Sequence, residues 1–348
     1  MTQDAPDSQQ LAARIERYRP LILEEMRAVV GADPAGMFSW MRYHLGWEDM
    51  HGAPAAESPG KMLRSVAVLL AAELVGGSAE AAVPAAAAVD LVHNFSLLHD
   101  DIEDASDTRR GRATVWSFAG IPQAINTGDA MFTLARLAMH RLQEAGEEER
   151  RVLEAMRELD EACLRLVEGQ YLDMAFETRS DVTPGEYVTM AAGKTAAMFG
   201  APFAIGALLG GADGTTVSAF RRFGTHLGLA FQAIDDLLDI WGDPATTGKP
   251  LGGDLLSRKR TYPVVASIEA GGAAAEALRA AYGVPPQPDE DYRALAALVE
   301  AAGGRAATVR LAREQLDEAR RSLASSHLDA DALALLEQYA QAATGRIP

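Results

Sequence analysis

Three observations predict an all-α protein, a bundle of roughly ten or more helices. Helical periodicity recurs from Gln9 to Gln341 and is broken by short segments rich in Gly and Pro. No run of alternating apolar and polar residues reads as a strand, and aromatic residues make up 6% of the chain. Alanine, the best helix former, fills stretches such as residues 84–89 and 294–302. We expect a single domain over residues 1–348, with residues 1–8 disordered.

Glycine and proline mark the connections between these helices. Residues 52–60 (GAPAAESPG) and 242–253 (GDPATTGKPLGG) predict two substantial loops. Residues 213–216 and 283–291 predict shorter connectors. The final segment, about 60 residues, is rich in alanine and charge, and it predicts helices used for packing or for oligomer contacts.

The composition narrows the class of protein. Hydrophobic residues make up 48% of the chain and charged residues 23%, which is ordinary for a globular protein with a core. The net charge of −17 argues against nucleic acid as a partner. A single cysteine, Cys163, allows no intrachain disulfide and fits a cytoplasmic location. The uncharged residues 195–212 contain Pro202 and several glycines, so we expect a buried bundle helix and no transmembrane segment.

Two copies of the pattern Asp-Asp-x-x-Asp follow apolar helical stretches. They comprise Asp100, Asp101 and Asp104 in the first copy, and Asp235, Asp236 and Asp239 in the second. Residues four apart stack on one face of a helix, so each copy gathers like charges that repel one another. One interpretation is a solvated acidic helix face, and the other is a cation site. The duplication and the apolar flanks favour the cation site, and carboxylates without Cys or clustered His favour Mg²⁺.

Basic residues accompany the acidic clusters in a chain that is short of positive charge. They occur in the segments Gly60–Arg64 (GKMLR) and Thr108–Arg112 (TRRGR), and as Lys194, Lys249 and Lys259. Arginine recognises phosphate oxygens in a planar, bidentate way, and lysine acts as a point charge. Acidic and basic groups together therefore predict a site for a metal–diphosphate complex.

Over residues 37–263 the sequence resembles the trans-isoprenyl diphosphate synthases, also called polyprenyl synthetases. Besides the two aspartate motifs, the matching segments are Gly60, Lys61 and Arg64; His93; Arg109 and Arg110; Gly169, Gln170 and Asp173; Lys194 and Thr195; Phe231 and Gln232; and Lys249, Asp254 and Lys259. Motifs in this order over some 200 residues are far more specific than any one of them alone. The resemblance implies helices around a central cavity, Mg²⁺ as cofactor and a homodimer.

The resemblance also implies a role for each matching residue. The metal would be held by Asp100, Asp101, Asp104 and Asp235, with support from Asp236 and Asp239. An allylic prenyl diphosphate would be contacted by Arg109, Lys194 and Lys259, with Lys249 assisting. Thr195 and Gln232 would be further substrate-binding residues. Isopentenyl diphosphate would be bound by Lys61, Arg64, His93 and Arg110. The implied reaction joins these two substrates into an all-trans polyprenyl diphosphate.

Two residues before the first motif are candidates for setting product length. Phe95 and Ser96 lie five and four residues before Asp100, and the resemblance to archaeal-type geranylgeranyl diphosphate synthases implies a C20 product. On a helical wheel, Ser96 lies near the carboxylate face, but Phe95 lies more than about 100° away. The interpretation of Phe95 as ordinary core therefore stays open. Met131 and Phe132 are candidates for an opposing wall.

Two other functions remain open at this point. A class I terpene cyclase on the same fold would ionise a diphosphate but would lack the basic pocket formed by Lys61, Arg64, His93 and Arg110. A non-catalytic subunit of a heteromeric synthase would have eroded aspartate clusters, whereas both clusters are intact here. The sequence alone leaves unresolved whether Glu103 reaches a metal.

Overall fold

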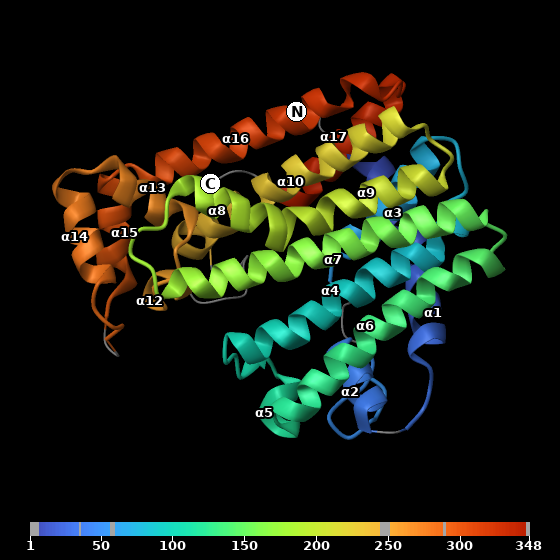
Figure 1. Cartoon of the computed structure of the whole chain (residues 1–348), viewed down its shortest axis with the longest axis horizontal. Helices are drawn as coiled ribbons and strands as arrows, with labels where there is room; N and C mark the ends of the chain where they lie inside the picture. Colours follow the sequence, from blue (N-terminus) through green and yellow to red (C-terminus); the bar gives the residue numbers. More distant parts are fainter. Residues whose placement is uncertain (1–6, 35, 56–59, 244–250, 288–289, 346–348) are drawn as a thin grey trace. The chain divides into compact units, whose positions relative to one another are not determined.

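The computed structural model describes residues 7–34, 36–55, 60–243, 251–287 and 290–345. These residues form more than ten α-helices, which confirms the all-α prediction (Figure 1). The first helix begins at Asp7, so Asp7 and Ser8 are helical instead of disordered, and residues 1–6 lie outside the described part.

The chain divides into two compact units. The first comprises residues 1–160, 201–220 and 328–332, and the second comprises the remainder. Four helices contribute residues to both units, namely α7 (Glu149–Glu177), α9 (Ala197–Leu209), α10 (Gly214–Trp241) and α17 (Ala330–Thr344).

The first unit contains the chain's N-terminal elements. These are α1 (Asp7–Val30), α2 (Gly36–His44), α3 (Leu63–Leu74), the 3-10 turn η1 (Glu80–Ala82), α4 (Val83–Glu103), β1 (Thr108–Arg109), β2 (Arg112–Ala113), α5 (Val115–Ala119) and α6 (Ile121–Glu144). The long helices α4 and α6 pack against each other (Figure 1). β1 and β2 form an antiparallel ribbon that the sequence did not predict, because strands of two residues are too short to show an alternating pattern.

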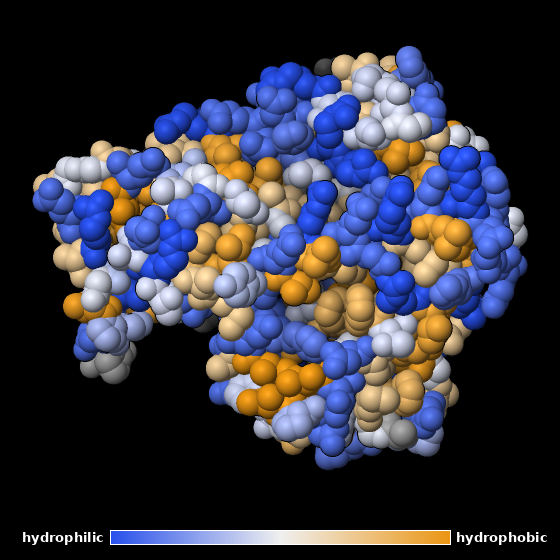
Figure 2. Space-filling view, in the orientation of Figure 1, coloured by the Kyte–Doolittle hydropathy of each residue, from blue (hydrophilic) through white to orange (hydrophobic). Residues whose placement is uncertain are grey.

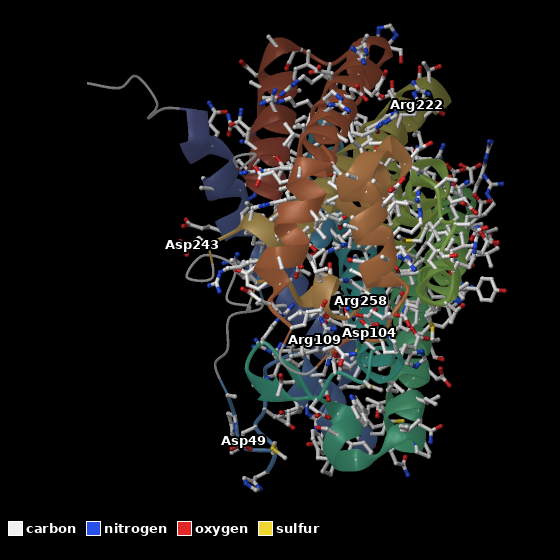
Figure 3. The ribbon with its side chains drawn as sticks, turned by 90° about the vertical axis from the view of Figure 1, so that its left-hand side faces the viewer. Asp49, Asp104, Arg109, Arg222, Asp243 and Arg258 are labelled. Atoms are coloured by element: carbon white, nitrogen blue, oxygen red, sulfur yellow. The ribbon has the colours of Figure 1, made fainter. Side chains whose placement is uncertain are left out.

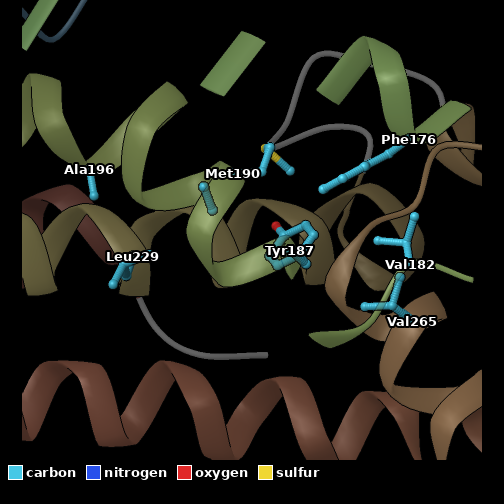
Figure 4. Packing of buried hydrophobic residues seen from close by; sticks show 8 residues of the cluster. Phe176, Val182, Tyr187, Met190, Ala196, Leu229 and Val265 are labelled. Atoms are coloured by element: carbon cyan, nitrogen blue, oxygen red, sulfur yellow. The ribbon is translucent and has the colours of Figure 1, made fainter. Parts of the chain in front are cut away.

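The second unit contains shorter helices around α10 and α16. Its elements are α8 (Pro184–Ala191), the π-helix η2 (Ala192–Ala196), α12 (Gly253–Leu256), α13 (Tyr262–Ala270), α14 (Gly272–Tyr282), α15 (Tyr292–Ala301), α16 (Gly304–Ser322) and the 3-10 turn η3 (Leu323–Ser325). A buried cluster joins α7, α8 and α13, with Tyr187, Phe176 and Val265 among its members (Figure 4).

Glycines permit close helix packing in the first unit. A Cβ at Gly206 on α9 would overlap the carbonyl oxygen of Val68 on α3 and lie 2.8 Å from Ala71 Cβ. A Cβ at Gly77 would likewise overlap the backbone of Gly210. These backbones touch because neither position carries a side chain, so glycine is required there.

The predicted connections are partly confirmed. Residues 283–287 and 290–291 are non-helical, as expected. The connector at 213–216 is shorter than predicted, because Asp213 accepts a hydrogen bond from the Thr216 backbone N–H at 2.7 Å and α10 already begins at Gly214. Most of the loop at 242–253, including Lys249, lies outside the described residues.

Two helical segments are long and apolar enough to cross a membrane. They are residues 80–103 and 184–209, and 72% and 78% of their apolar windows are buried inside the protein. Such burial is typical of core helices and agrees with the expectation for the stretch at 195–212. The face in Figure 2 is largely hydrophilic, with scattered hydrophobic patches, as is ordinary for a folded protein.

Candidate active site

The first aspartate motif occupies the C-terminal end of α4. The helix begins with Pro84 in its first turn, buries an apolar run, and ends at Glu103 with Asp104 as its C-cap. Asp101 is only 2% exposed, whereas Asp104 is exposed. Carboxylates at a helix C-terminus oppose the helix dipole, and burial raises the pKa of Asp101 to about 6 although Arg109 opposes this shift. This arrangement calls for a neutralising cation.

Arg109 supplies positive charge to this cluster. Its Nε donates to Asp101 Oδ1 at 2.7 Å and its Nη2 to Asp100 Oδ2 at 3.2 Å. Arg109 and Asp104, both in the first unit, are labelled in Figure 3. Arg109 is held there by the ribbon, whose turn residues Arg110 and Gly111 both have positive φ, 52° and 75°. Two such residues are typical of the tight turn that closes a β-hairpin. A non-glycine residue in this strained region is a common mark of a functional site.

The first cluster also suits a divalent cation that is completed by other ligands. Asp101 Oδ2 is buried and accepts no hydrogen bond from the described residues. In the part of the chain that the structure describes, no group of three or more His, Cys, Asp or Glu side chains is arranged to hold an ion alone. Mg²⁺ is usually bound by one or two carboxylates together with waters and substrate phosphates, so a closed protein cage is not required. The residues present therefore fit such an ion.

A second group of basic residues lies in the same unit. Arg110 Nη2 lies 3.8 Å from the position that a Cβ of Gly60 would occupy, which places it beside the segment Gly60–Arg64. Burial lowers the pKa of His93 well below its usual value, and the charges of Arg64 and Arg110 add to this effect. His93 is therefore neutral and faces two guanidinium groups, a setting suited to an anionic ligand. Lys61 is exposed immediately before α3.

Two further residues, His44 and Asp90, belong to this basic region, and sequence reasoning did not assign them a role. Burial lowers the pKa of His44 to about 3, helped by the charges of Arg109, Arg110 and Arg112. One small pocket is lined by these three arginines together with His44 and Asp101. Asp90 is 7% exposed, and burial raises its pKa to about 6 against the opposing charges of Arg64 and Arg110. His44 carries no signal in the sequence, because the fold alone brings α2 to the ribbon.

The second aspartate motif lies on α10 in the second unit, and its middle residue is the most buried. Asp236 is 2% exposed, and Asp235 is exposed. Asp236 Oδ2 accepts hydrogen bonds from the Tyr187 hydroxyl at 2.6 Å and the Tyr262 backbone N–H at 2.9 Å. Its Oδ1 accepts one from Gln232 Nε2 at 2.9 Å. Burial raises the pKa of Asp236 to about 8 despite these donors. Asp236 therefore connects α8, α10 and α13.

The third residue of this motif contacts the segment that follows it. Asp239 Oδ2 accepts a hydrogen bond from the Asp254 backbone N–H at 3.1 Å. Burial raises the pKa of Asp254 to about 7, the charge of Asp239 adds to this shift, and the charge of Lys259 opposes it. Lys259 thus lies near the carboxylates of the second unit, as its place after the motif predicted.

The Lys194–Thr195 pair lies on a π-helix, a form that is frequent at functional sites. Lys194 Nζ donates to Asp173 Oδ2 at 2.5 Å. Thr195 Oγ1 donates to Gln232 Oε1 at 2.7 Å and so joins the network around Asp236. A Cβ at Gly169 would lie 2.7 Å from Lys194 Cα, so the glycine lets α7 approach the π-helix closely. The fold thus joins four sequence motifs of this unit.

The two candidates for product length differ in their surroundings. The Ser96 hydroxyl donates to the His93 carbonyl oxygen at 2.8 Å. Phe95 is 8% exposed and packs against Phe132 on α6, with ring centroids 4.9 Å apart. Met131 is fully buried.

Comparison with known proteins assigns this chain and its fold to a class. The family model for polyprenyl synthetase matches residues 53–299, and the chain belongs to this family. Geranylgeranyl diphosphate synthase of Mycobacterium tuberculosis is 45% identical over 84% of this chain and 83% of that protein. The (2E,6E)-farnesyl diphosphate synthase of the same species is 41% identical over 86% and 84%. An archaeal geranylgeranyl diphosphate synthase, from Methanosarcina mazei, is 42% identical over 62% and 65%.

Solved structures give the same result for the fold and add information on metals. The polyprenyl synthetase of Streptomyces coelicolor A3(2) is 40% identical, with a TM-score of 0.89 over 96% of this chain and 99% of that one. A geranylgeranyl pyrophosphate synthase from Corynebacterium glutamicum, 26% identical with a TM-score of 0.80 over 96% and 98%, is complexed with isoprenyl diphosphate and magnesium. A polyprenyl synthase from Caulobacter crescentus, 28% identical with a TM-score of 0.83 over 98% of each chain, is complexed with calcium and isoprenyl diphosphate. The family therefore uses divalent metal.

Proposed function

We propose that this trans-prenyltransferase condenses isopentenyl diphosphate with an allylic diphosphate in the presence of Mg²⁺. The observation that carries the proposal is the pair of distinct cationic sites in the first unit. Arg109 is bound to Asp100 and Asp101, whereas Arg110 points to Gly60 and joins Arg64 and His93. A condensing enzyme needs one anion site for each of its two diphosphates.

The donor residues divide between the two substrates. The sequence motifs assign Arg109, Lys194 and Lys259 to the allylic diphosphate, with Lys249 assisting. Thr195 and Gln232, which are hydrogen-bonded to each other, are further substrate-binding residues. Isopentenyl diphosphate is bound by Lys61, Arg64, His93 and Arg110. Neutral His93 donates a ring N–H to a diphosphate oxygen without adding to the charge already supplied by the arginines.

Asp100, Asp101, Asp104 and Asp235 are the proposed metal ligands, and Asp236 and Asp239 support them. When bound, Mg²⁺ stabilises the negative charge that develops on the departing diphosphate. Asp101 offers its buried Oδ2, and Asp236, whose oxygens already accept hydrogen bonds, holds α10 in place.

The remaining residues position and shield the reacting carbons. The arginines and lysines place the two diphosphates so that the double bond of isopentenyl diphosphate faces the allylic carbon. Apolar residues such as Phe95 and Leu98 exclude water from the cation that forms there. No protein nucleophile is required, because the double bond itself attacks and a proton is then lost.

We further propose geranylgeranyl (C20) diphosphate as the product, with Phe95 and Ser96 limiting chain length. The relative with 45% identity bears that name, and a second relative is named for farnesyl diphosphate. A single large side chain at these two positions supports an intermediate product length. We also propose that the chain works as a homodimer in the cytoplasm and that residues 1–348 form one catalytic domain.

The test uses the purified protein with Mg²⁺, isopentenyl diphosphate and each allylic primer in turn. We expect elongated prenyl diphosphates in the wild type, and a loss of turnover of about 10²–10³-fold or more in Asp100→Asn and Asp235→Asn. Asp107→Asn, an exposed carboxylate outside the motif, serves as the control and should retain turnover. Cyclic hydrocarbons without elongation would indicate a terpene cyclase, and a lack of any turnover would indicate a non-catalytic subunit. Wild-type rates in both aspartate variants would contradict the metal assignment.

A further inference from the structure

Three aromatic rings meet between α4 and α6 beside the first aspartate motif. The Phe95 ring lies 4.9 Å from that of Phe132 and 5.7 Å from the imidazole of His99, edge to face with the latter. Phe95 precedes Asp100 by five residues, or about 7.5 Å along the helix axis. This cluster of rings therefore lies before the carboxylates along the helix, where α4 packs against α6.

The imidazole of His99 is seated in a gap that glycine leaves on α6. A Cβ at Gly128 would overlap Nε2 and Cδ2 of His99, closer than the 3.0 Å that real Cβ atoms keep from other heavy atoms. The same Nε2 lies 3.3 Å from the Ile125 carbonyl oxygen and 3.6 Å from Asp129 Oδ1. The ring thus reaches the backbone of α6, which any side chain at position 128 would prevent.

The position of the Phe95 ring depends on His99, and the position of the His99 ring depends on Gly128. Gly128 leaves room for the His99 ring, and that ring contacts the Phe95 ring in an edge-to-face arrangement. Phe132 contacts Phe95 as well. Two rings therefore contact Phe95, and one of them, that of His99, is seated where position 128 lacks a side chain.

We propose that Gly128 and His99 form a steric interlock that fixes the ring of Phe95 and thereby sets the length of the prenyl chain. The inference rests on the proposed condensation reaction and adds His99 and Gly128 to its specificity-determining residues. The growing tail stops where it meets the fixed ring. When the imidazole is displaced, the Phe95 ring can rotate, and a longer prenyl tail then fits beside it.

The experiment is a double-mutant cycle with Gly128→Ala, His99→Ala and the two together. Gly214→Ala is the matched control, because a Cβ there meets no atom within 4 Å. We expect each single variant to raise the ratio of longer products to the main wild-type product by about tenfold, the scale of one methylene in an apolar pocket. In the His99→Ala background the added methyl has no ring to displace, so the double variant should match His99→Ala. The control should give the wild-type product.

Two outcomes would overturn the interlock. The first is a wild-type product distribution in His99→Ala, a variant that only removes atoms and tests the idea even if Gly128→Ala does not fold. The second is an effect of Gly128→Ala that persists unchanged in the His99→Ala background.

Unfolding by urea gives a readout that does not depend on turnover. The effect of Gly128→Ala on the free energy of unfolding should differ between the wild type and the His99→Ala background. Such coupling in a protein that elongates no primer would refute the proposed function and leave the interlock standing. Elongation by the wild type without any coupling would refute the interlock alone.

Discussion

Replacing Tyr187 with Phe tests whether Asp236 holds the second aspartate motif in place. The change removes one hydroxyl, which donates to Asp236 Oδ2 at 2.6 Å. Tyr187 is 3% exposed, and its ring stacks edge to face with Tyr262 at 5.5 Å, so the phenyl ring of the variant keeps this packing. Burial raises the pKa of Tyr187 well above 10, and the hydroxyl is therefore a donor at neutral pH.

The loss of stability in Tyr187→Phe depends on the hydrogen bonds that Asp236 retains. Asp236 keeps the Gln232 Nε2 and the Tyr262 backbone N–H, both at 2.9 Å, and loses its shortest hydrogen bond. Asp236 is uncharged at neutral pH because its pKa is raised to about 8. A hydrogen bond between uncharged groups contributes about 0.5–1.5 kcal/mol, so the free energy of unfolding should fall by about 1 kcal/mol. Turnover should fall by about ten- to hundredfold, because small displacements of positioning groups are costly.

Urea unfolding and steady-state turnover at several Mg²⁺ concentrations measure these effects. Tyr262→Phe is the matched control, since Tyr262 reaches Asp236 through its backbone N–H, which the substitution leaves intact. If Tyr187→Phe matches Tyr262→Phe in stability to within about 0.5 kcal/mol and also in turnover, the network around Asp236 has no positioning role.

Two further predictions concern the first unit. His44 has a pKa lowered to about 3, so below pH 6.5 the unfolded chain binds a proton that the folded protein does not, and stability falls as the pH falls. Between pH 7.5 and 5.5 the free energy of unfolding, measured with urea, should therefore fall by about 1 kcal/mol more in the wild type than in His44→Gln. Equal decreases in the two proteins would mean that His44 binds a proton in the folded state as readily as in the unfolded state. Gly206→Ala adds a methyl that overlaps the Val68 carbonyl and should lower the free energy of unfolding by about 1–3 kcal/mol. Gly214→Ala is its control, and equal stability of the two variants would contradict the close packing of α3 and α9.

Much of the fold was predictable because it depends on local patterns. The period of apolar residues predicted helices, and the buried helix at residues 195–212 followed from its lack of charge. The two-residue strands and the helix start at Gly214 were missed, because the first are too short for a pattern and the second depends on the Asp213 cap. Such features arise from a single turn or a single side chain.

The candidate site was predictable in its members but not in its contacts. The motifs identified Arg109, Arg110, Lys194 and Gln232, and the structure shows that Arg109 binds Asp101 and that Gln232 binds Asp236. His44 and Asp90 carried no recognisable pattern. They join the basic region because α2 and α4 bring them near the arginines, and distance along the chain gives no information on such contacts.

The sequence by itself determined the helical class, the doubled carboxylate motif and the family. Each of these depends only on which residue types occur and on how far apart they lie along the chain. The tertiary structure decided which of three aspartates is buried, which cation neutralises it and which side chain Gly128 admits. Those properties depend on desolvation and on steric contact between helices, and both arise only when segments distant in the chain pack against each other.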